Sequence, residues 1–245
     1  MSVMAKRCGA VRVLEADPDL AQALPADERD EATRALAAPV VALDSGEWSP
    51  RRADGEGDGR VGVLILSGLM TREIAIGDTV SAELLGPTDV IRPWDPTDRH
   101  ALLPYEVRWQ VLEPARLALL GAGFAQAAAR WPALTTALVR RTVRRSHALG
   151  LTAAITCTTG LETRLLMLFW HLADRWGKVT ADGVTIPVQL THETIARLVG
   201  ARRPSISTAL KRLERDGRLA RVHRGGWLLT GDPVGSEPPS TASAA

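Results

Sequence analysis

Hydrophobic residues divide the chain into a front part with the spacing of β-strands and a rear part with the spacing of helices. In the front part, short hydrophobic runs separated by Gly, Pro and Asp are typical of a β-sandwich or small barrel. These runs are Val40–Leu43, Val61–Leu66, Ile74–Ile76, Val80–Leu85 and Tyr105–Leu120. Two short amphipathic helices divided by Pro25 precede the strands, and Asp17 and Asp27 are their expected N-caps.

A long helix is predicted next, from Trp131-Pro132 to about Ile155. Its polar positions include four arginines, which form like-charge pairs four residues apart: Arg140, Arg141, Arg144 and Arg145. Such pairs repel each other unless acids or a partner lie near. The pattern fits either a solvated basic face or a connecting helix that contributes to a dimer interface.

Behind the long helix, helices alternate with hairpins. Thr159-Gly-Leu-Glu162 has the form of a capping box, and the amphipathic helix that it starts is expected to end at Gly177. Asp182-Gly183 predicts a first hairpin turn. A second hairpin is expected around residues 224–226, between Leu219–Val222 and Trp227–Leu229. The order helix, hairpin, helix pair, hairpin is that of a winged helix.

The helix pair lies between Thr191 and Gly217, with Gly200 suited to the left-handed residue between the two helices. Each helix has one apolar stripe: Ile195, Leu198 and Val199 on the first, and Ile206, Ala209, Leu210 and Leu213 on the second. The opposite face of the second helix carries Pro204, Ser207, Thr208, Lys211 and Arg215, with Arg202 and Arg203 at its entrance. A short basic helix with small polar residues suits the major groove of DNA.

Taken alone, this segment fits a helical hairpin with a solvated basic face equally well. The second hairpin favours the DNA-binding interpretation, because the arginines of a wing, here Arg221 and Arg224, can rest on phosphates.

Charge is distributed unevenly although the formal net charge is only +2. Residues 13–59 hold twelve acids and four bases, whereas residues 191–231 hold nine bases and three acids. This asymmetry indicates that the rear of the protein meets a polyanion.

The two cysteines, Cys8 and Cys157, exclude a disulfide framework and fit a reducing compartment. No apolar run has the length of a membrane span, and Lys6 and Arg7 are not followed by the apolar region of a signal peptide. We therefore expect a cytoplasmic protein that does not bind membranes.

Two stretches resemble the DNA-binding domain of Crp/Fnr-type transcription regulators: Leu161–Gly177, and Leu190 through the helix pair to Gly217. The similarity covers about residues 158–231, and the rest of the chain is similar in architecture only. The resemblance implies a jelly-roll domain that responds to a small-molecule effector, a homodimer held along the long helix, and a two-fold-related promoter site on double-stranded DNA, where RNA polymerase is a further expected partner.

Position by position, Arg203 matches the guanine-reading arginine of the family, and a guanidinium can bond bidentately to guanine O6 and N7. Pro204 stands where the best-studied members have a cytosine-reading glutamate, and Thr208 where they often have a second arginine. The operator should therefore differ from that of the cyclic-AMP receptor. Thr191 and Ser205 are expected as caps or phosphate contacts.

The sequence disfavours three kinds of signal for the N-terminal domain. The Gly-Glu and Arg-Ser/Thr-Ala motifs of a cyclic-nucleotide pocket are not matched at Gly86–Trp94, which argues against cyclic AMP. An iron–sulfur sensor would need four cysteines where two are present, and the spacing of His100 and Cys8 does not support haem binding. No cofactor or metal is predicted.

Two other classes of function fit the sequence less well. A cupin-like enzyme needs two or three histidines on strands, and only His100 lies in the β-rich half. A non-specific architectural DNA binder would not need so large a β-domain, and it would bind without operator preference. We therefore expect a transcription regulator rather than an enzyme.

The sequence thus predicts an α+β fold with an N-terminal β jelly-roll sensor domain similar to a cyclic-nucleotide-binding domain, a long connecting dimerisation helix and a C-terminal winged helix-turn-helix. The expected boundaries are 1–128 for the sensor domain with its N-terminal helices, 129–157 for the connecting helix, 158–232 for the DNA-binding domain and 233–245 for a disordered tail.

Overall fold

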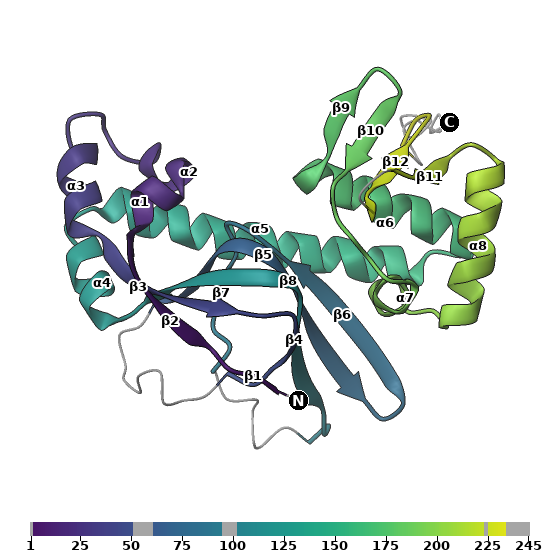
Figure 1. The fold of residues 1–245 in the computed structure, drawn as a ribbon, viewed down its shortest axis with the longest axis horizontal. Helices are drawn as coiled ribbons and strands as arrows, with labels where there is room; N and C mark the ends of the chain where they lie inside the picture. Colours follow the sequence, from purple (N-terminus) through teal and green to yellow (C-terminus); the bar gives the residue numbers. More distant parts are fainter. Residues whose placement is uncertain (1, 51–60, 95–101, 223–224, 234–245) are drawn as a thin grey trace, which may run out of the picture. The chain divides into compact units, whose positions relative to one another are not determined.

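The computed structural model describes residues 2–50, 61–94, 102–222 and 225–233. The chain forms two compact units, Met1–Leu149 and Gly150–Ala245. The first contains a mostly antiparallel sheet with helices and the second a helix-turn-helix with a small sheet, so the predicted α+β fold is confirmed (Figure 1). Arg224, His100 and the tail from residue 234 lie outside the described residues.

The N-terminal unit is organised around the long strand β8, Glu106–Leu120, which pairs with β3 (Ala37–Leu43), β4 (Gly46–Trp48) and β5 (Gly62–Ile76). Strand β5 also pairs with β6 and β7 (Figure 1). The remaining strands are β1 (Ser2–Val3), β2 (Lys6–Arg12), β6 (Thr79–Leu85) and β7 (Val90–Ile91).

The strands differ from the predicted ones in two ways. The runs Val61–Leu66 and Ile74–Ile76 belong to the single strand β5, whose pairing with β8 shifts register around Gly68. A Cβ at Gly68 would lie 2.4 Å from the Pro114 carbonyl oxygen, so the glycine allows the two strands to approach closely. Strand β2 was missed because most of its side chains are exposed, which leaves no hydrophobic alternation.

The helices of this unit are α1 (Val13–Ala16), α2 (Pro18–Ala21), α3 (Arg29–Ala35), α4 (Ala122–Ala128) and the long α5 (Pro132–Cys157), which continues into the second unit. Asp17 caps α2 as predicted, because its side chain accepts a hydrogen bond from the Leu20 amide at 3.4 Å. Asp27 is not a cap: α3 begins one residue later than expected, after Glu28, whose side chain forms no cap hydrogen bond.

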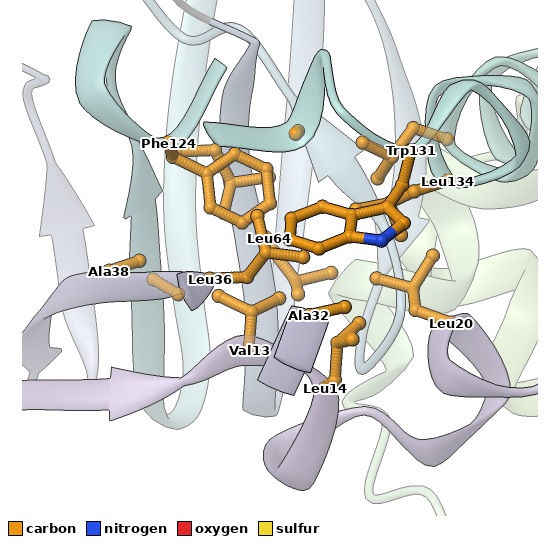
Figure 2. Packing of buried hydrophobic residues seen from close by; sticks show 14 of the residues in the cluster. Val13, Leu14, Leu20, Ala32, Leu36, Ala38, Leu64, Phe124, Trp131 and Leu134 are labelled. Atoms are coloured by element: carbon orange, nitrogen blue, oxygen red, sulfur yellow. The ribbon is translucent and has the colours of Figure 1, made fainter. Parts of the chain in front are cut away.

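Trp131 lies in the middle of a hydrophobic cluster that joins the start of α5 to the N-terminal helices (Figure 2). The indole is 4% exposed and packs among Leu20, Leu64 and Leu134, with Phe124 close by. A second cluster fills the strands and includes Trp48 and Trp109. The first turns of α5 therefore belong to the core of the N-terminal unit.

Two of the four α5 arginines have acidic partners in the N-terminal unit, which resolves the like-charge pairs of the sequence. Both guanidinium NH groups of Arg141 donate to the Asp17 carboxylate, one of them at 2.7 Å to Oδ1, and one also donates to the Thr88 carbonyl at 3.2 Å. Arg145 binds Glu83 through two hydrogen bonds of 2.6 and 2.7 Å. Arg140 and Arg144 are exposed.

The C-terminal unit contains α6 (Leu161–Trp176), α7 (His192–Val199) and α8 (Arg203–Arg215) against a four-stranded sheet (Figure 1). In sheet order its strands are β11 (Leu219–Arg221), β12 (Trp227–Leu229), β10 (Gly183–Ile186) and β9 (Lys178–Thr180). The strands of both predicted hairpins pair as expected, but the first turn is Ala181-Asp182 and not the predicted Asp182-Gly183, because Gly183 pairs with Thr180 as the first residue of β10. The capping box is not formed: Gly160 is the N-cap residue of α6 and makes no side-chain cap.

Candidate nucleic-acid interface

Helices α7 and α8 form the predicted helix pair, and their apolar stripes are buried. Ile195, Leu198 and Val199 of α7 pack in the core, as do Ile206, Ala209, Leu210 and Leu213 of α8. Thr191 is the N-cap of α7, because its hydroxyl oxygen accepts from the Thr194 amide at 3.1 Å. Gly200 ends α7 with a left-handed φ of 63°.

Two contacts hold this pair to α6. The Arg164 guanidinium donates to the Val199 carbonyl at 3.0 Å, which satisfies one of the free carbonyls at the end of α7. Arg212 of α8 forms an ion pair of 2.9 Å with Glu162. A backbone hydrogen bond at Glu162 itself and the bond from Arg212 lower the pKa of the Glu162 carboxyl. The orientation of α8 is therefore fixed by its buried apolar stripe on one side and by the Arg212–Glu162 ion pair on the other.

The face of α8 opposite the apolar stripe is exposed, as a groove-reading helix requires. Its exposed residues are Arg202, Arg203, Pro204, Ser205, Thr208 and Lys211, and Ser207 is half-buried. Pro204 lies in the first turn, where a missing amide hydrogen is tolerated. The side chains of Arg202, Arg203 and Lys211 form no hydrogen bond or ion pair with other described residues. Their positive charges are available to a polyanion.

Ser207 and Thr208 use their hydroxyls locally. Each donates to the carbonyl four residues earlier, Ser207 to Arg203 and Thr208 to Pro204, both at 3.4 Å. Each hydroxyl still has at least one lone pair that can accept a further hydrogen bond. Ser205 lies in the first turn and is exposed, with no side-chain cap formed at this helix end.

His192 was not among the predicted site residues, yet it lies beside three of them. Its Nδ1 is 2.9 Å from the Ser207 Oγ. Partial burial lowers the pKa of His192, and the positive charges of Arg221 and Arg203 lower it further, whereas Glu214 raises it. The first helix, the recognition face of the second and the last strand pair thus converge on one imidazole. In the sequence, the only feature that could have identified His192 as a site residue was its position directly after the N-cap Thr191.

Arg221, predicted as a wing residue, is exposed at the end of β11, where its guanidinium lies 4.4 Å above the Trp227 ring. Such cation–π contacts orient an arginine without neutralising it. Trp227 is itself fixed in the core, with its ring centre 4.7 Å from that of Phe169. The charge of Arg221 is therefore carried on a rigid support.

A model of the Crp-like helix-turn-helix domain matches residues 163–232. This part of the chain is a Crp-like helix-turn-helix domain. No curated protein matches the chain in sequence.

Solved structures extend the similarity of fold to the N-terminal unit. A CooA variant from Carboxydothermus hydrogenoformans is 15% identical, with a TM-score of 0.60 over 92% of this chain and 93% of that one. A cyclic nucleotide-binding domain containing protein from Listeria monocytogenes EGD-e is 14% identical, with a TM-score of 0.61 over 86% and 96%. A CRP-family transcriptional regulator from Thermus thermophilus is 21% identical, with a TM-score of 0.52 over 76% and 90%.

The chain thus combines a Crp-like helix-turn-helix domain with a fold similar to that of these solved structures. None of the described helices is both long enough and apolar enough to cross a membrane.

Proposed function

We propose that the protein is a sequence-specific DNA-binding regulator that acts as a homodimer on an inverted-repeat promoter site. The observation that carries the proposal is the exposed face of α8, whose Arg202, Arg203 and Lys211 have no partner among the described residues. A helix that buries one face and leaves unpaired cations on the other fits the major groove, where phosphates attract the cations and base edges are read.

Within this face, Arg203 is the proposed guanine reader, because it lies in the first turn of α8 and its guanidinium is unpaired among the described residues. Ser207, Thr208 and Lys211 follow on the same face as further base contacts. Arg202, Ser205, Thr191 and Arg221 are proposed phosphate contacts, which position the domain without reading sequence. Pro204 has no side-chain donor or acceptor, so it affects the choice of operator only through apolar contacts in the groove.

Helix α5 supports the proposal of a homodimer. Val139, Val143 and Leu151 on this helix are 55%, 48% and 47% exposed, at intervals of four and eight residues. Side chains at such intervals fall on one side of a helix. A second copy of α5 would bury this stripe and place two recognition helices for two half-sites. A signal received by the N-terminal unit would then act on DNA binding through α5. The dimer bound at the promoter would contact RNA polymerase.

Selection from random duplexes tests the proposal. The wild type is expected to recover an inverted repeat, and the Arg203→Ala variant to lose preference at one symmetric base pair in each half-site. Recovery of no repeat would contradict dimeric, sequence-specific binding and favour the architectural alternative. Uniform weakening by the Arg203→Ala change, with preference intact, would make Arg203 a phosphate contact instead.

A further inference from the structure

Arg164 lies near the start of α6 and makes a contact that its effect on stability does not explain. Its guanidinium donates to the Val199 carbonyl at 3.0 Å, from a partly buried position. Among the residues that the structure describes, its buried Nε has no hydrogen-bond partner, and no aspartate or glutamate forms an ion pair with it. A buried donor without an acceptor and a partly buried cation without a counter-ion both lower stability. The contact is therefore more informative for what it positions than for the stability that it adds.

The acceptor of this bond lies where the chain leaves α7. Val199 is the last residue of α7, and the last carbonyls of a helix have no amide partner within it. The next residue, Gly200, has a left-handed φ of 63° and its amide donates to the Ala196 carbonyl. The Ala201 amide donates to the same carbonyl at 2.9 Å, so the course of the chain beyond α7 is fixed. Arg164 supplies the partner that the helix itself does not give to the Val199 carbonyl.

The segment that follows leads directly to the recognition helix. Only residues 200–202 separate the Val199 carbonyl from Arg203, the first residue of α8. The Arg202 carbonyl accepts from two amides of α8, at 3.0 and 3.2 Å, so the start of α8 is itself regular. A turn this short and this fully bonded cannot absorb a displacement of the Val199 carbonyl. Any such displacement therefore moves Arg203.

The start of α6 holds both helices of the pair, but it holds them unequally. Glu162 binds Arg212 of α8 at 2.9 Å, with side chains that are 37% and 58% exposed. Exposed ion pairs of this kind contribute little, because water and salt screen them. Arg164 instead forms a partly buried bond to the backbone of α7. The stronger of the two attachments is therefore the one that lies closer to Arg203 along the chain.

We propose that Arg164 is a positioning residue for base readout: by holding the end of α7, it sets the angle at which Arg203 enters the major groove. A guanidinium that reads guanine must meet O6 and N7 at the same time, so it tolerates little displacement. Cations that contact phosphates carry no sequence information and adapt to small shifts through their flexible stems. Loss of the Arg164 contact therefore reduces discrimination between bases more than affinity for DNA in general. This inference rests on the proposed function.

Fluorescence anisotropy of the full chain tests the proposal with three duplexes: the selected inverted repeat, the repeat with the guanine assigned to Arg203 changed in both half-sites, and an unrelated sequence. Arg164→Met is expected to reduce the preference for the repeat over its changed form by about tenfold, within the discrimination that one bidentate contact provides. Its affinity for the unrelated duplex should change by less than about twofold, because the phosphate contacts remain. Unchanged preference in Arg164→Met would overturn the proposal.

Two further results separate positioning from a direct contact of Arg164 with DNA. Arg164→Lys keeps a long side chain with an N–H donor, and it is expected to recover most of the preference lost in Arg164→Met. The salt dependence of binding should be the same in wild type and Arg164→Met. If Arg164 neutralised a phosphate, Arg164→Met would instead weaken binding to every duplex equally, and the slope of log K against log salt would decrease by about 0.9. That pattern would also overturn the proposal.

Measurements without DNA separate positioning from general stabilisation. The unfolding midpoint of Arg164→Met should change by only a few degrees, because the loss of one bond is offset by removal of the unsatisfied Nε and the unpaired charge. Hydrogen exchange should become faster at the amides of Gly200 and Ala201, which close the end of α7, and stay unchanged in the middle of α6. A large fall in the midpoint with faster exchange throughout α6 and α7 would make Arg164 a general stabiliser and contradict the proposal.

Arg175→Met is the matched control. It removes the same side chain from the other end of α6, where the Arg175 guanidinium lies 4.4 Å from the centre of the Trp176 ring, and base preference should stay at the wild-type value. A similar loss of preference in this variant would contradict a specific role of Arg164. A wild type that selects no inverted repeat overturns the DNA proposal and this inference with it, whereas a repeat whose preference survives Arg164→Met overturns this inference alone.

Discussion

The imidazole Nδ1 of His192 lies 2.9 Å from the hydroxyl oxygen of Ser207 and so connects the first helix of the helix-turn-helix to the recognition face of the second. The Ser207 hydroxyl also donates to the Arg203 carbonyl at 3.4 Å. His192 thereby helps to hold the Ser207 side chain in place on this face.

Replacing His192 by Ala is expected to weaken operator binding about three- to tenfold, because a typical hydrogen bond contributes about 0.5–1.5 kcal/mol. Preference should relax at the base pair that Ser207 contacts, while thermal stability changes little. Fluorescence anisotropy with the selected duplex and its single-base variants measures both effects. The control is Glu193→Ala, at the residue that follows His192. It removes only the exposed ion pair between Glu193 and Arg197 and should leave the base preference intact.

Operator binding should become tighter as the pH falls from about 7.5 to 6. Burial, Arg221 and Arg203 hold the pKa of His192 below its ordinary value in the free protein. Phosphates near Arg221 and Arg203 would offset those positive charges and raise the pKa of His192 in the complex, so that binding takes up a proton. The dissociation constant measured at both pH values tests this, and His192→Asn should remove the difference. A variant with an unchanged pH dependence would show that another group is responsible.

The free energy of unfolding should decrease as the pH falls through about 6.5. Burial lowers the pKa of His171 on α6, with a further lowering by Arg175 and an opposing effect of Asp174. Below the unfolded pKa, the unfolded chain binds the proton while the folded chain does not, so this contribution to stability is lost towards the lower folded pKa. Urea unfolding at pH 7.5 and 5.5 measures the change. His171→Gln should reduce it, and an identical slope in that variant would exclude His171 as its source.

Asp17→Asn is expected to destabilise the N-terminal unit by about 3–5 kcal/mol, because it leaves the charge of Arg141 buried without its counter-ion. The side chains of Arg141 and Asp17 are 11% and 5% exposed. Asparagine retains the N-cap of α2, so the change isolates the ion pair from the cap. Chemical unfolding measures the loss. Asp44→Asn, in an exposed pair with Lys6, should change stability by less than about 1 kcal/mol; similar losses in both variants would contradict the explanation.

Trp131→Ala should destabilise the N-terminal unit by about 3–5 kcal/mol, the usual effect of deleting a buried aromatic side chain. The indole occupies the centre of its cluster (Figure 2). Unfolding followed by circular dichroism gives the change. Trp94→Ala, at a half-buried position, provides a comparison with a tryptophan outside this cluster. A loss no larger than that of Trp94→Ala would contradict a central role for Trp131.

Features of the fold that are determined by residues close together in the sequence could be predicted, whereas features that depend on residues far apart in the sequence could not. The helix pair is encoded locally, by the apolar stripes and by Gly200, and it was predicted almost residue by residue. The caps divide in the same way: Asp17 was correct, but at Asp27 the choice between adjacent acidic residues depends on how α3 packs. The sequence of strand β2 shows no alternation of hydrophobic and polar residues, because the strand is held by its pairing with β3 and not by burial of one face.

The site shows the same limit. Arg203 and Lys211 follow from the pattern of one helix, whereas the contact between His192 and Ser207 joins residues of two helices. Arg141 and Asp17 lie 124 residues apart, so the sequence could raise the question of what neutralises the α5 arginines but could not answer it. Ion pairs of this kind depend on the tertiary fold, and the repulsion between arginines within one helix gives no information about it.

The cluster around Trp131 has a consequence for the way the protein is made. It draws on residues from Val13 to Leu138 and therefore on both ends of the N-terminal unit. During synthesis, the first helices leave the ribosome long before the start of α5 exists to cover them. Their apolar side chains stay open to other chains for that interval, and such exposure favours aggregation. The last part of this core to be translated is thus the part that closes it.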